Sequence, residues 1–553
     1  MAGMKSFKSD VRIGHSLNEA ERNHLDRRTK TVQKCLQQQS ISCTKDEVPN
    51  IAVLGSGGGL RAMVGLLGSL SQLSEEGLLN CIMYLSGVSG STWCMASLYN
   101  ESDWSTKLET VKRNIIKRLT GPSVSSLVKG EKLLKYYLTK DNFSLTDVWA
   151  ALFVAKMVNE INESGITKQR NHFSSDPYPI YNVIDKKCKY DKLNADCWFE
   201  ITPDESGYSL TGAFVNSQCL GSQFKNGKKI KEQPEIDMLY LQGLCGSIIA
   251  EMEELLRLLL SLIQDKMEPA DTSTSQKSDE QKGREVLLNL VHLNLCAMKD
   301  QDPEVFLQNL TELLKDKHQG TEALKTPEGK ISKADLEKYT LHVCSSVFDW
   351  FGGSGFGDDV WIAIARSIEK IGGWIWGKTY NYLNNMTVEG VDHSVLNSEK
   401  REYEDAGLLI NSPYFSVLRK ERNIDLIISL DFSAGDPYQT VVQTAKMCQE
   451  LHIPYPKVVI PSEDQTEPKD FYVFRGYNKA PTVIHIPLFN SINCKGEIKE
   501  YKKRYQTFQM NYTSEMITDL LKKAALNIIN NKKNLLTEIK YVTEQKKMSK
   551  LLK

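Results

Sequence analysis

Three serines lie close together in the segment CIMYLSGVSGSTWCMASLYN at 81–100, namely Ser86, Ser89 and Ser91. An apolar run enters the segment, small residues fill its middle and a helical pattern follows, which predicts a strand that turns sharply into a helix. α/β hydrolases hold a nucleophilic serine at such a turn, and the turn tolerates only small residues two positions before and after it. Ser89 alone meets that rule, because each of the other two serines has an aromatic residue two positions away.

The motif departs from the strict Gly-x-Ser-x-Gly pattern, because Ser91 stands where the second glycine belongs. An ordinary strand-to-helix turn, with Ser89 as the helix N-cap, is the alternative interpretation. The motif alone does not separate a nucleophile from a cap.

A glycine loop, GSGGGL at 55–60, precedes this segment. It is not a dinucleotide fingerprint, because Leu60 occupies the third glycine position, and it lacks the Gly-Lys-Ser/Thr ending of a P-loop. Its bare backbone N–H groups at a helix N-terminus attract negative charge and, beside the serine turn, would make an oxyanion hole. Tight packing of helix on sheet is the alternative. Arg61 follows directly, either as a cation for a second anion such as a phosphate or as a brace of the loop through its carbonyls.

An activating base is harder to identify among the histidines. A hydrolase triad runs serine, acid, histidine, and after Asp405 only His452 and His485 remain. His485 lies within the apolar run TVIHIP and is expected to be a hydrogen-bonded core residue, and His452 is expected in a loop. Asp405, in YEDAGLLINSP at 403–413, precedes a tight turn from which a carboxylate could project toward a site, although aspartate at a turn is also an ordinary turn former.

The elements around these residues repeat one plan. An apolar strand at 51–54 leads through the glycine loop into a helix at 60–76, and residues 81–99 again read as strand, turn and helix. Such units favour an α/β fold with a mixed central β-sheet flanked by helices. Further strand signals come late in the chain, at 424–437, 457–461 and 482–490. A sheet that begins before residue 90 and resumes after 400 predicts one large domain that carries an insertion.

The remaining segments complete the predicted organisation. Residues 264–284 are polar and lack aromatic side chains, which predicts a flexible insertion, and a second polar stretch runs over 314–338. Residues 16–38 predict an exposed helix with Ser16 and Glu19 as its capping box. The expected division is an N-terminal helical extension (1–44), a catalytic domain (45–545) and a basic tail (546–553).

Composition narrows the function classes for this 553-residue chain. Lys+Arg and Asp+Glu balance at 69 each, so no nucleic-acid partner is indicated. The N-terminus lacks the apolar core of a secretory signal, and no window offers about 20 apolar residues for a membrane span. The 12 cysteines form no CxxC pairs, so no zinc site or disulfide framework is predicted. We expect a cytoplasmic protein without a metal or cofactor.

Four stretches carry a resemblance to a known family: GSGGGLRAM, YLSGVSGSTW, EDAGLLINSP and LIISLDFSAGDP. Together they resemble the group IV cytosolic phospholipases A2, within the patatin-like lipases. The resemblance covers about 45–545 apart from 264–284, and it implies the patatin-like catalytic fold with a mobile, lid-like insertion.

The resemblance also implies roles for individual residues. Ser89 matches the family's nucleophile and Asp405 its partner in a Ser–Asp dyad, which would explain the missing histidine. Gly58 and Gly59 match the oxyanion hole, and Arg61 matches the position that holds the lipid phosphate. The implied activity is hydrolysis of glycerophospholipid esters through an acyl-enzyme, with lysophospholipase and transacylase side reactions. A lipase with a Ser–His–Asp triad and a catalytically silent lipid-binding protein of the same fold stay as alternatives.

Two departures from the family pattern concern calcium and the membrane. Calcium-regulated members carry an N-terminal C2 domain of well over a hundred residues, whereas only about 50 residues precede the glycine loop here, so we expect no C2 domain and calcium-independent activity. The chain ends KKMSKLLK, without the prenylation box of some members. Peripheral contact with intracellular membranes would then need another surface.

Two features could supply a lipid contact. The segment 521–553 holds nine lysines and two glutamates among leucines and isoleucines, and it is expected either to lie on anionic lipid or to be a solvated terminal helix. Four tryptophans fall between 350 and 376 and are expected in the core or lining a substrate tunnel rather than at the surface.

Overall fold

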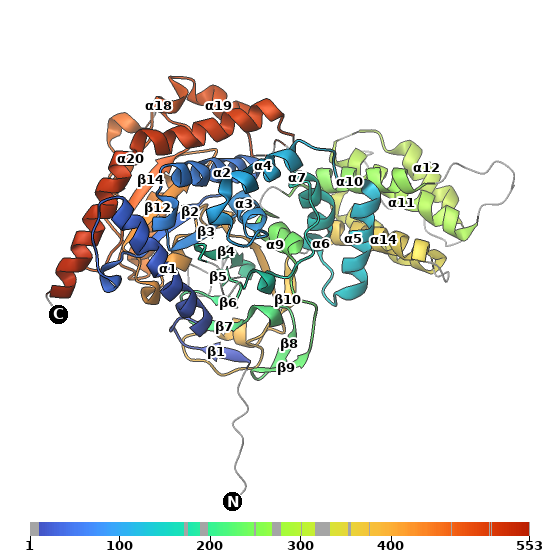
Figure 1. The fold of residues 1–553 in the computed structure, drawn as a ribbon. Helices are drawn as coiled ribbons and strands as arrows, with labels where there is room; N and C mark the ends of the chain where they lie inside the picture. Colours follow the sequence, from blue (N-terminus) through green and yellow to red (C-terminus); the bar gives the residue numbers. More distant parts are fainter. Residues whose placement is uncertain are drawn as a thin grey trace, which may run out of the picture. The chain divides into compact units, whose positions relative to one another are not determined.

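The computed structural model describes residues 10–551, apart from 171–174, 188–196, 248–249, 268–277, 300, 316–331, 352–355, 375, 466, 508 and 510. The chain divides into two compact units. The sheet unit comprises Met1–Gly121, Asn162–Ile249 and Thr379–Lys553, and the helical unit comprises Pro122–Ile161 and Ala250–Lys378. Both are drawn in Figure 1.

The sheet unit is built on a mixed twelve-stranded sheet. Ten of its strands follow the order β1 (Val11–Ile13), β7 (Ala213–Asn216), β6 (Glu205–Tyr208), β5 (Trp198–Ile201), β4 (Tyr178–Asp185), β3 (Tyr84–Gly87), β2 (Ile51–Gly55), β12 (Leu426–Asp431), β14 (Thr482–Pro487) and β13 (Tyr472–Phe474). The other two are β10 (Lys378–Tyr380) and β11 (Lys400–Asp405), and a separate hairpin joins β8 (Gln223–Lys225) to β9 (Lys228–Lys231).

The five central strands, from β4 to β14, are parallel and buried along their whole length. Their sequences are nearly continuous apolar runs, such as IAVLG in β2 and LIISLD in β12, as expected for strands covered on both faces. Parallel strands share one carboxyl edge, so the loops after β2, β3, β12 and β14 gather there. This edge carries the residues discussed below.

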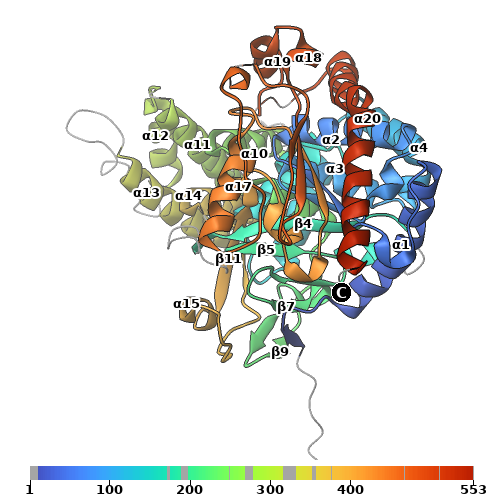
Figure 2. The ribbon, with the colours of Figure 1, turned by 90° about the vertical axis from the view of Figure 1, so that its left-hand side faces the viewer.

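Helices cover both faces of the sheet. Figure 2 shows α17 (Gln439–Glu450) on one side of the strands and α2 (Gly59–Glu75) with α20 (Ser514–Leu551) on the other. The remaining helices of the sheet unit are α1 (Glu19–Gln38), α3 (Gly90–Leu98), α4 (Leu108–Leu119), α9 (Met238–Cys245), α15 (His393–Leu396), α16 (Tyr414–Val417), α18 (Ser491–Cys494) and α19 (Ile498–Arg504). The predicted mixed sheet flanked by helices is confirmed.

The helical unit consists of α5 (Ser126–Thr139), α6 (Leu145–Val148), α7 (Ala155–Met157), α10 (Met252–Lys266), α11 (Asp279–Met298), α12 (Glu304–Leu313), α13 (Lys333–Val347) and α14 (Phe356–Gly373). A π-helical segment, Trp149–Val154, joins α6 to α7. Trp149 stacks on Phe153 and meets the edge of Trp376. Two of the four clustered tryptophans, Trp361 and Trp376, are buried, as predicted for core positions.

One prediction of local structure was wrong, and a second falls partly outside the described residues. Residues 457–461 form no strand, although KVVIP is apolar, because prolines at 454, 456 and 461 interrupt the segment and deprive it of ladder donors. The ends of the predicted flexible insertion at 264–284 belong to α10 and α11, and its middle lies outside the described residues.

The N-terminal helix α1 also differs from the expectation. Its N-cap is Asn18, whose side chain accepts from the Ala20 N–H, rather than Ser16. The helix is not simply exposed, because it buries Glu21 and Arg28 together with apolar residues against the sheet unit. Its charged residues had suggested solvent exposure, whereas two of them find partners in the interior.

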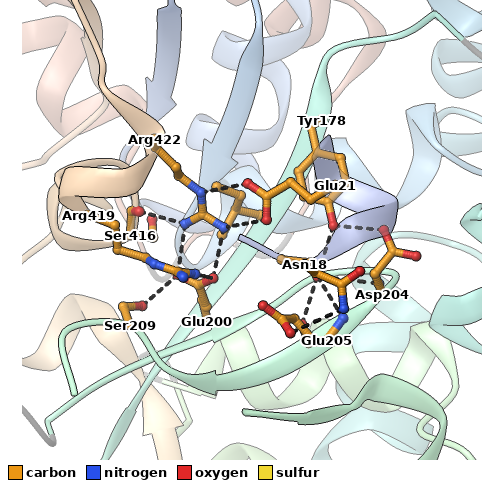
Figure 3. Close-up of polar contacts among 12 residues, drawn as sticks. Asn18, Glu21, Tyr178, Glu200, Asp204, Glu205, Ser209, Ser416, Arg419 and Arg422 are labelled. Atoms are coloured by element: carbon orange, nitrogen blue, oxygen red, sulfur yellow. Dashed lines mark hydrogen bonds and ion pairs between the residues drawn. The ribbon is translucent and has the colours of Figure 1, made fainter. Parts of the chain in front are cut away.

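Glu21 belongs to a buried ionic cluster that joins α1 to the sheet (Figure 3). The Arg422 guanidinium lies between two carboxylates, with Nε 2.9 Å from Glu21 Oε1 and Nη1 2.8 Å from Glu200 Oε2. Arg419 Nη1 donates to Glu200 Oε1 at 2.6 Å, and Ser209 Oγ donates to Oε2 at 2.7 Å. Burial alone would raise the pKa of Glu200, but the two guanidiniums and these hydrogen bonds outweigh it and lower the pKa to about 2.

We expect Glu200→Gln to lower the free energy of unfolding at pH 7 by about 3–5 kcal/mol, because it leaves two buried guanidiniums short of a charge partner. The depressed pKa of Glu200 means that its contribution is complete above about pH 4.5 and is lost as the pH falls toward 2. Urea titrations at several pH values should therefore show the gap between wild type and variant narrowing below pH 4.5. As a control, Lys107→Ala breaks a pair whose partners are 44% and 45% exposed and should cost under about 1 kcal/mol. A constant gap down to pH 2 would contradict this assignment.

The lysine-rich C-terminal segment is the end of α20, so residues 546–551 continue that helix. Its apolar stripe, which includes Ile528, Leu535 and Ile539, is buried, and α20 packs along α2. Lys532 and Lys546 pair with Glu76 and Asp425. The apolar face is therefore occupied by the protein's own core, which favours a terminal helix packed on the sheet unit over one laid on lipid.

Candidate active site

Ser89 lies at the turn between β3 and α3, where the sequence predicted a nucleophile. Its backbone has φ 48° and ψ −130°, a strained conformation for a residue with a side chain. Thr92 N–H donates to its carbonyl oxygen as α3 begins. Such strain costs about 1–3 kcal/mol and persists only where the surroundings impose it, as at a nucleophile elbow.

Glycines allow the backbones around Ser89 to approach closely. A Cβ placed on Gly57 would lie 2.8 Å from the Ser89 Cβ, and one on Gly90 would lie 2.0 Å from the Gly59 carbonyl oxygen. The glycine loop and the serine turn are thus in direct contact. Ser89 is 1% exposed, and its Oγ has no hydrogen-bond partner among the residues that the structure describes.

The register of β4 brings Asp405 to the same place. β3 occupies one edge of β4 as far as the pair Gly87–Tyr181, and β11 then runs antiparallel along β4 until Asp405 meets Val183. Tyr181 and Val183 are two residues apart, about 6.6 Å along the strand. Asp405 therefore ends its strand where the chain turns into Ser89. The 315 intervening residues gave no means of predicting this proximity.

Further contacts hold Asp405 at this position. Its side chain is fully buried, its Oδ1 accepts from the Gly407 N–H at 2.8 Å, and its own N–H donates to Ser247 Oγ at 3.0 Å. Burial, with the Asp405 carboxylate as the next cause, raises the pKa of the Cys245 thiol well above its usual value. Cys245 also lies within hydrogen-bond reach of Thr92, in the first turn of the helix that follows Ser89.

The two histidines considered for a triad lie elsewhere. His485 is on β14, three strand spacings from β3 or about 14 Å, and its register places it level with Ser86. It is fully buried, its Nε2 donates to the Pro437 carbonyl at 2.6 Å, and burial lowers its pKa, which confirms a core role. His452 is exposed just beyond α17, as predicted for a loop residue.

The glycine loop forms the start of α2. Gly58 is the N-cap, with φ 150°, and Gly59 follows with φ 57°, so both adopt conformations that favour glycine. A Cβ on Gly58 would also meet Arg61 Nη2 at 2.7 Å. The positive end of the α2 dipole and the first unpaired N–H groups of that helix thus lie beside Ser89.

Arg61 is buried and already bonded to the protein. Its Nε donates to the Phe432 carbonyl at 2.7 Å, Nη1 to the Tyr505 carbonyl at 2.5 Å and Nη2 to Thr507 Oγ1 at 3.1 Å, and the residue is 1% exposed. Each guanidinium nitrogen therefore has a protein acceptor. The geometry gives no support to the predicted phosphate contact and agrees with the alternative of a brace behind the glycine loop.

These groups together could perform acyl transfer. A strained serine hydroxyl, a buried carboxylate from a neighbouring strand and N–H groups at a helix N-terminus are the parts that such chemistry requires. Among the described residues, no group of three His, Cys, Asp or Glu side chains gathers in a way that could hold a metal ion.

Comparisons with known proteins identify the family. The lysophospholipase catalytic domain family matches residues 51–277. The chain is 33% identical to mouse (Mus musculus) cytosolic phospholipase A2 gamma, over 95% of this chain and 91% of that protein, and 31% identical to the human (Homo sapiens) gamma protein, over 96% of each. The chain belongs to the cytosolic phospholipase A2 family. The resemblance seen in the sequence is confirmed.

Other relatives of the chain are longer. It is 30% identical to mouse cytosolic phospholipase A2 zeta over 87% of its own length but only 54% of that protein. Among solved structures, the human GIVD cytosolic phospholipase A2 superposes with a TM-score of 0.67 at 22% identity, covering 98% of this chain and 69% of that one. This likeness shows that the two share a fold.

Sequence reasoning missed the amide side chains that hold this site together. Asn182, fully buried on β4, donates from Nδ2 to Ser86 Oγ and to the Gly87 carbonyl, each at 2.9 Å, and so fixes the last residues of β3. Asn411 contacts Gly57 in the glycine loop. Its place in EDAGLLINSP, six residues after Asp405, was the only sequence signal for it.

We expect Arg61→Lys and Arg61→Ala to lower kcat/KM by the same factor for phosphatidylcholine and for a p-nitrophenyl ester, which has no phosphate. The loss should be about 10-fold or more, since hydrogen bonds from a charged group contribute about 1.5–3 kcal/mol and the glycine loop serves both substrates. Arg504→Ala removes a more exposed arginine of α19 and serves as the control, with little change expected. A loss of kcat/KM confined to phosphatidylcholine would instead support the predicted contact between Arg61 and the lipid phosphate.

Proposed function

We propose that this member of the family is a calcium-independent phospholipase A2 that cleaves fatty-acyl esters of glycerophospholipids through a Ser89–Asp405 dyad. The observation that carries the proposal is the shared edge of β4, which brings the end of β3 and the end of β11 to one point. The gamma relatives, similar over nearly their whole length, support the substrate class. Lysophospholipase and transacylase reactions follow if the acyl group is taken from a lysophospholipid or passed to another lipid in place of water.

In the proposed reaction Ser89 Oγ attacks the ester carbonyl while Asp405 takes the hydroxyl proton. The Gly58 and Gly59 N–H groups then stabilise the negative charge on the carbonyl oxygen, assisted by the α2 dipole. Asp405 then passes that proton to the departing lysophospholipid oxygen, which leaves an acyl-Ser89 ester and a free carboxylate. In the second step Asp405 takes a proton from the water that attacks this ester and returns it to Ser89 Oγ as the free fatty acid leaves. The Gly407 N–H bond orients the carboxylate throughout, and burial of Asp405 keeps bulk water away from it.

The proposed setting is the cytoplasm and the surface of intracellular membranes, where phospholipid substrates are found. No helix in the described part of the chain is long and apolar enough to cross a bilayer. The names of the relatives as cytosolic phospholipases A2 support this setting.

We expect Ser89→Ala and Asp405→Asn each to lower the rate of phosphatidylcholine hydrolysis at least about 10³-fold, because a nucleophile and its base act as one unit. Both variants should unfold within a few degrees of wild type, since each substitution is nearly isosteric. The measurement is fatty-acid release from defined vesicles, with Tm from circular dichroism.

The matched control is His485→Asn, which removes the core histidine of the alternative triad. Hydrolysis should continue in the folded variant, since His485 lies about 14 Å from β3. If folded His485→Asn is as inactive as Ser89→Ala, the triad replaces the dyad. If wild type releases no fatty acid and also fails to react with an acyl fluorophosphonate, the silent lipid-binding alternative is supported.

Calcium gives an independent test of the proposal. Hydrolysis of the same vesicles should be equal in 1 mM calcium and in excess EGTA, as implied by the resemblance to calcium-independent members. A large fall in EGTA that calcium restores would overturn this part of the proposal.

A further inference from the structure

Asn411 pairs with the peptide groups of Gly57 through both ends of its amide. Its Oδ1 accepts from the Gly57 N–H at 3.2 Å, and its Nδ2 donates to the Gly57 carbonyl oxygen, also at 3.2 Å. The Asn411 backbone carbonyl accepts from the same N–H, at 3.2 Å. Asn411, in the loop that follows Asp405, thus holds Gly57, the residue just before Gly58, through three hydrogen bonds.

Two further side chains, Asp431 and Ser433, fix which way the Asn411 amide is oriented. Asp431, 2% exposed at the end of β12, accepts from the Ser433 hydroxyl at 2.7 Å. Because that hydroxyl proton is used for the carboxylate, Ser433 Oγ meets Asn411 Nδ2 as an acceptor, at 2.9 Å. The Asn411 amide therefore has only one favourable orientation, with its NH₂ group toward Ser433 and Gly57 O and its oxygen toward Gly57 N.

The hold on the Gly57 carbonyl has a consequence for catalysis. The Gly57 C=O and the Gly58 N–H belong to one planar trans peptide group, in which they point in opposite directions. Fixing the carbonyl oxygen against Asn411 on one side therefore aims the Gly58 N–H to the other side. The unusual φ of 150° at Gly58 leaves this peptide plane few other restraints, since glycine permits many orientations.

We propose that Asn411 is a positioning residue for the oxyanion hole, and that the chain Asp431–Ser433–Asn411 orients the Gly57–Gly58 peptide so that the Gly58 N–H meets the developing charge. The inference rests on the proposed acyl transfer and assigns to Asn411 a part in it that does not require contact with substrate. It also couples the two halves of the site, because Asn411 and Asp405 share one loop. Movement of the base would thereby move the oxyanion donor.

The decisive comparison is between Asn411→Ala and Asn411→Asp. Alanine removes both side-chain hydrogen bonds to Gly57 and keeps only the backbone bond from the Gly57 N–H to the residue 411 carbonyl. The more loosely held Gly58 donor should lower kcat about 10- to 100-fold, less than the 10²- to 10³-fold loss of a whole donor. Aspartate keeps the shape but turns an acceptor toward the Gly57 carbonyl, so it should be worse than alanine. A residue that only fills space would give the opposite order, with aspartate nearer to wild type.

Three further readouts separate orientation from general damage. KM should stay within about twofold of wild type, and affinity for an acyl trifluoromethyl ketone, which mimics the oxyanion, should fall in parallel with kcat. Ser433→Ala should lower kcat about three- to tenfold alone and have no further effect in the Asn411→Ala background. The control is Gln443→Ala, which removes a hydrogen bond to the carbonyl of Leu409 in the same loop and should leave kcat unchanged.

Full activity in Asn411→Ala, or equal losses in kcat and in binding of the fatty-acid product, would overturn the inference. If Asn411→Ala fails to fold, Ser433→Ala provides the test, because Ser433 lies at the outer end of the Asp431–Ser433–Asn411 chain of hydrogen bonds. An unchanged kcat in Ser433→Ala would contradict the inference. A wild-type protein without hydrolysis would refute the proposed function and this inference together, whereas active wild type with unaffected Asn411 variants refutes the inference alone.

Discussion

The arrangement of the site depends on one edge of a single strand. β4 pairs with β3 along its first half and with β11 along its second half, on the same edge. β3 runs parallel to β4 and leads into the turn at Ser89, whereas β11 runs antiparallel to β4 and ends at Asp405. Only Asn182 separates the last β3 pair, at Tyr181, from the last β11 pair, at Val183, on this edge of β4. The proximity of the β3 end before Ser89 and the β11 end at Asp405 is thus set by hydrogen-bond register, and sites built on strands are positioned more precisely than sites on loops.

The glycine loop depends on residues distant in the sequence. Arg61 ties it to the segments after β12 and α19, and Asn411 ties it to the loop of Asp405. Close packing also requires the absence of side chains, since a Cβ on Gly57 would meet Asn411 Oδ1 at 2.4 Å. Buried polar groups elsewhere in the sheet unit also link segments that are distant in the sequence. The Glu21–Arg422–Glu200 cluster, for example, joins α1 to the sheet (Figure 3).

The sequence alone predicted the parts whose constraints are local. The turn at Ser89 and the glycine loop are short-range patterns of small residues, and the apolar runs of β2, β12 and β14 are typical of a buried parallel sheet. The sequence alone did not predict contacts between segments that are distant along the chain. Arg61 illustrates this limit, because a cation beside an anion-attracting loop suggests a phosphate, while its acceptors lie hundreds of residues away. The charged helix α1 was misjudged for the same reason, since the partners of Glu21 lie on other elements.

The most direct measurement of the central claim is covalent labelling with a long-chain acyl fluorophosphonate, followed by peptide mapping in a mass spectrometer. A serine activated by a carboxylate from β11 should give one adduct per chain, on Ser89, formed quickly in wild type and at a greatly reduced rate in Asp405→Asn of equal Tm. An adduct on Ser86 or Ser91, or labelling of Ser89 at an undiminished rate in Asp405→Asn, would contradict the dyad.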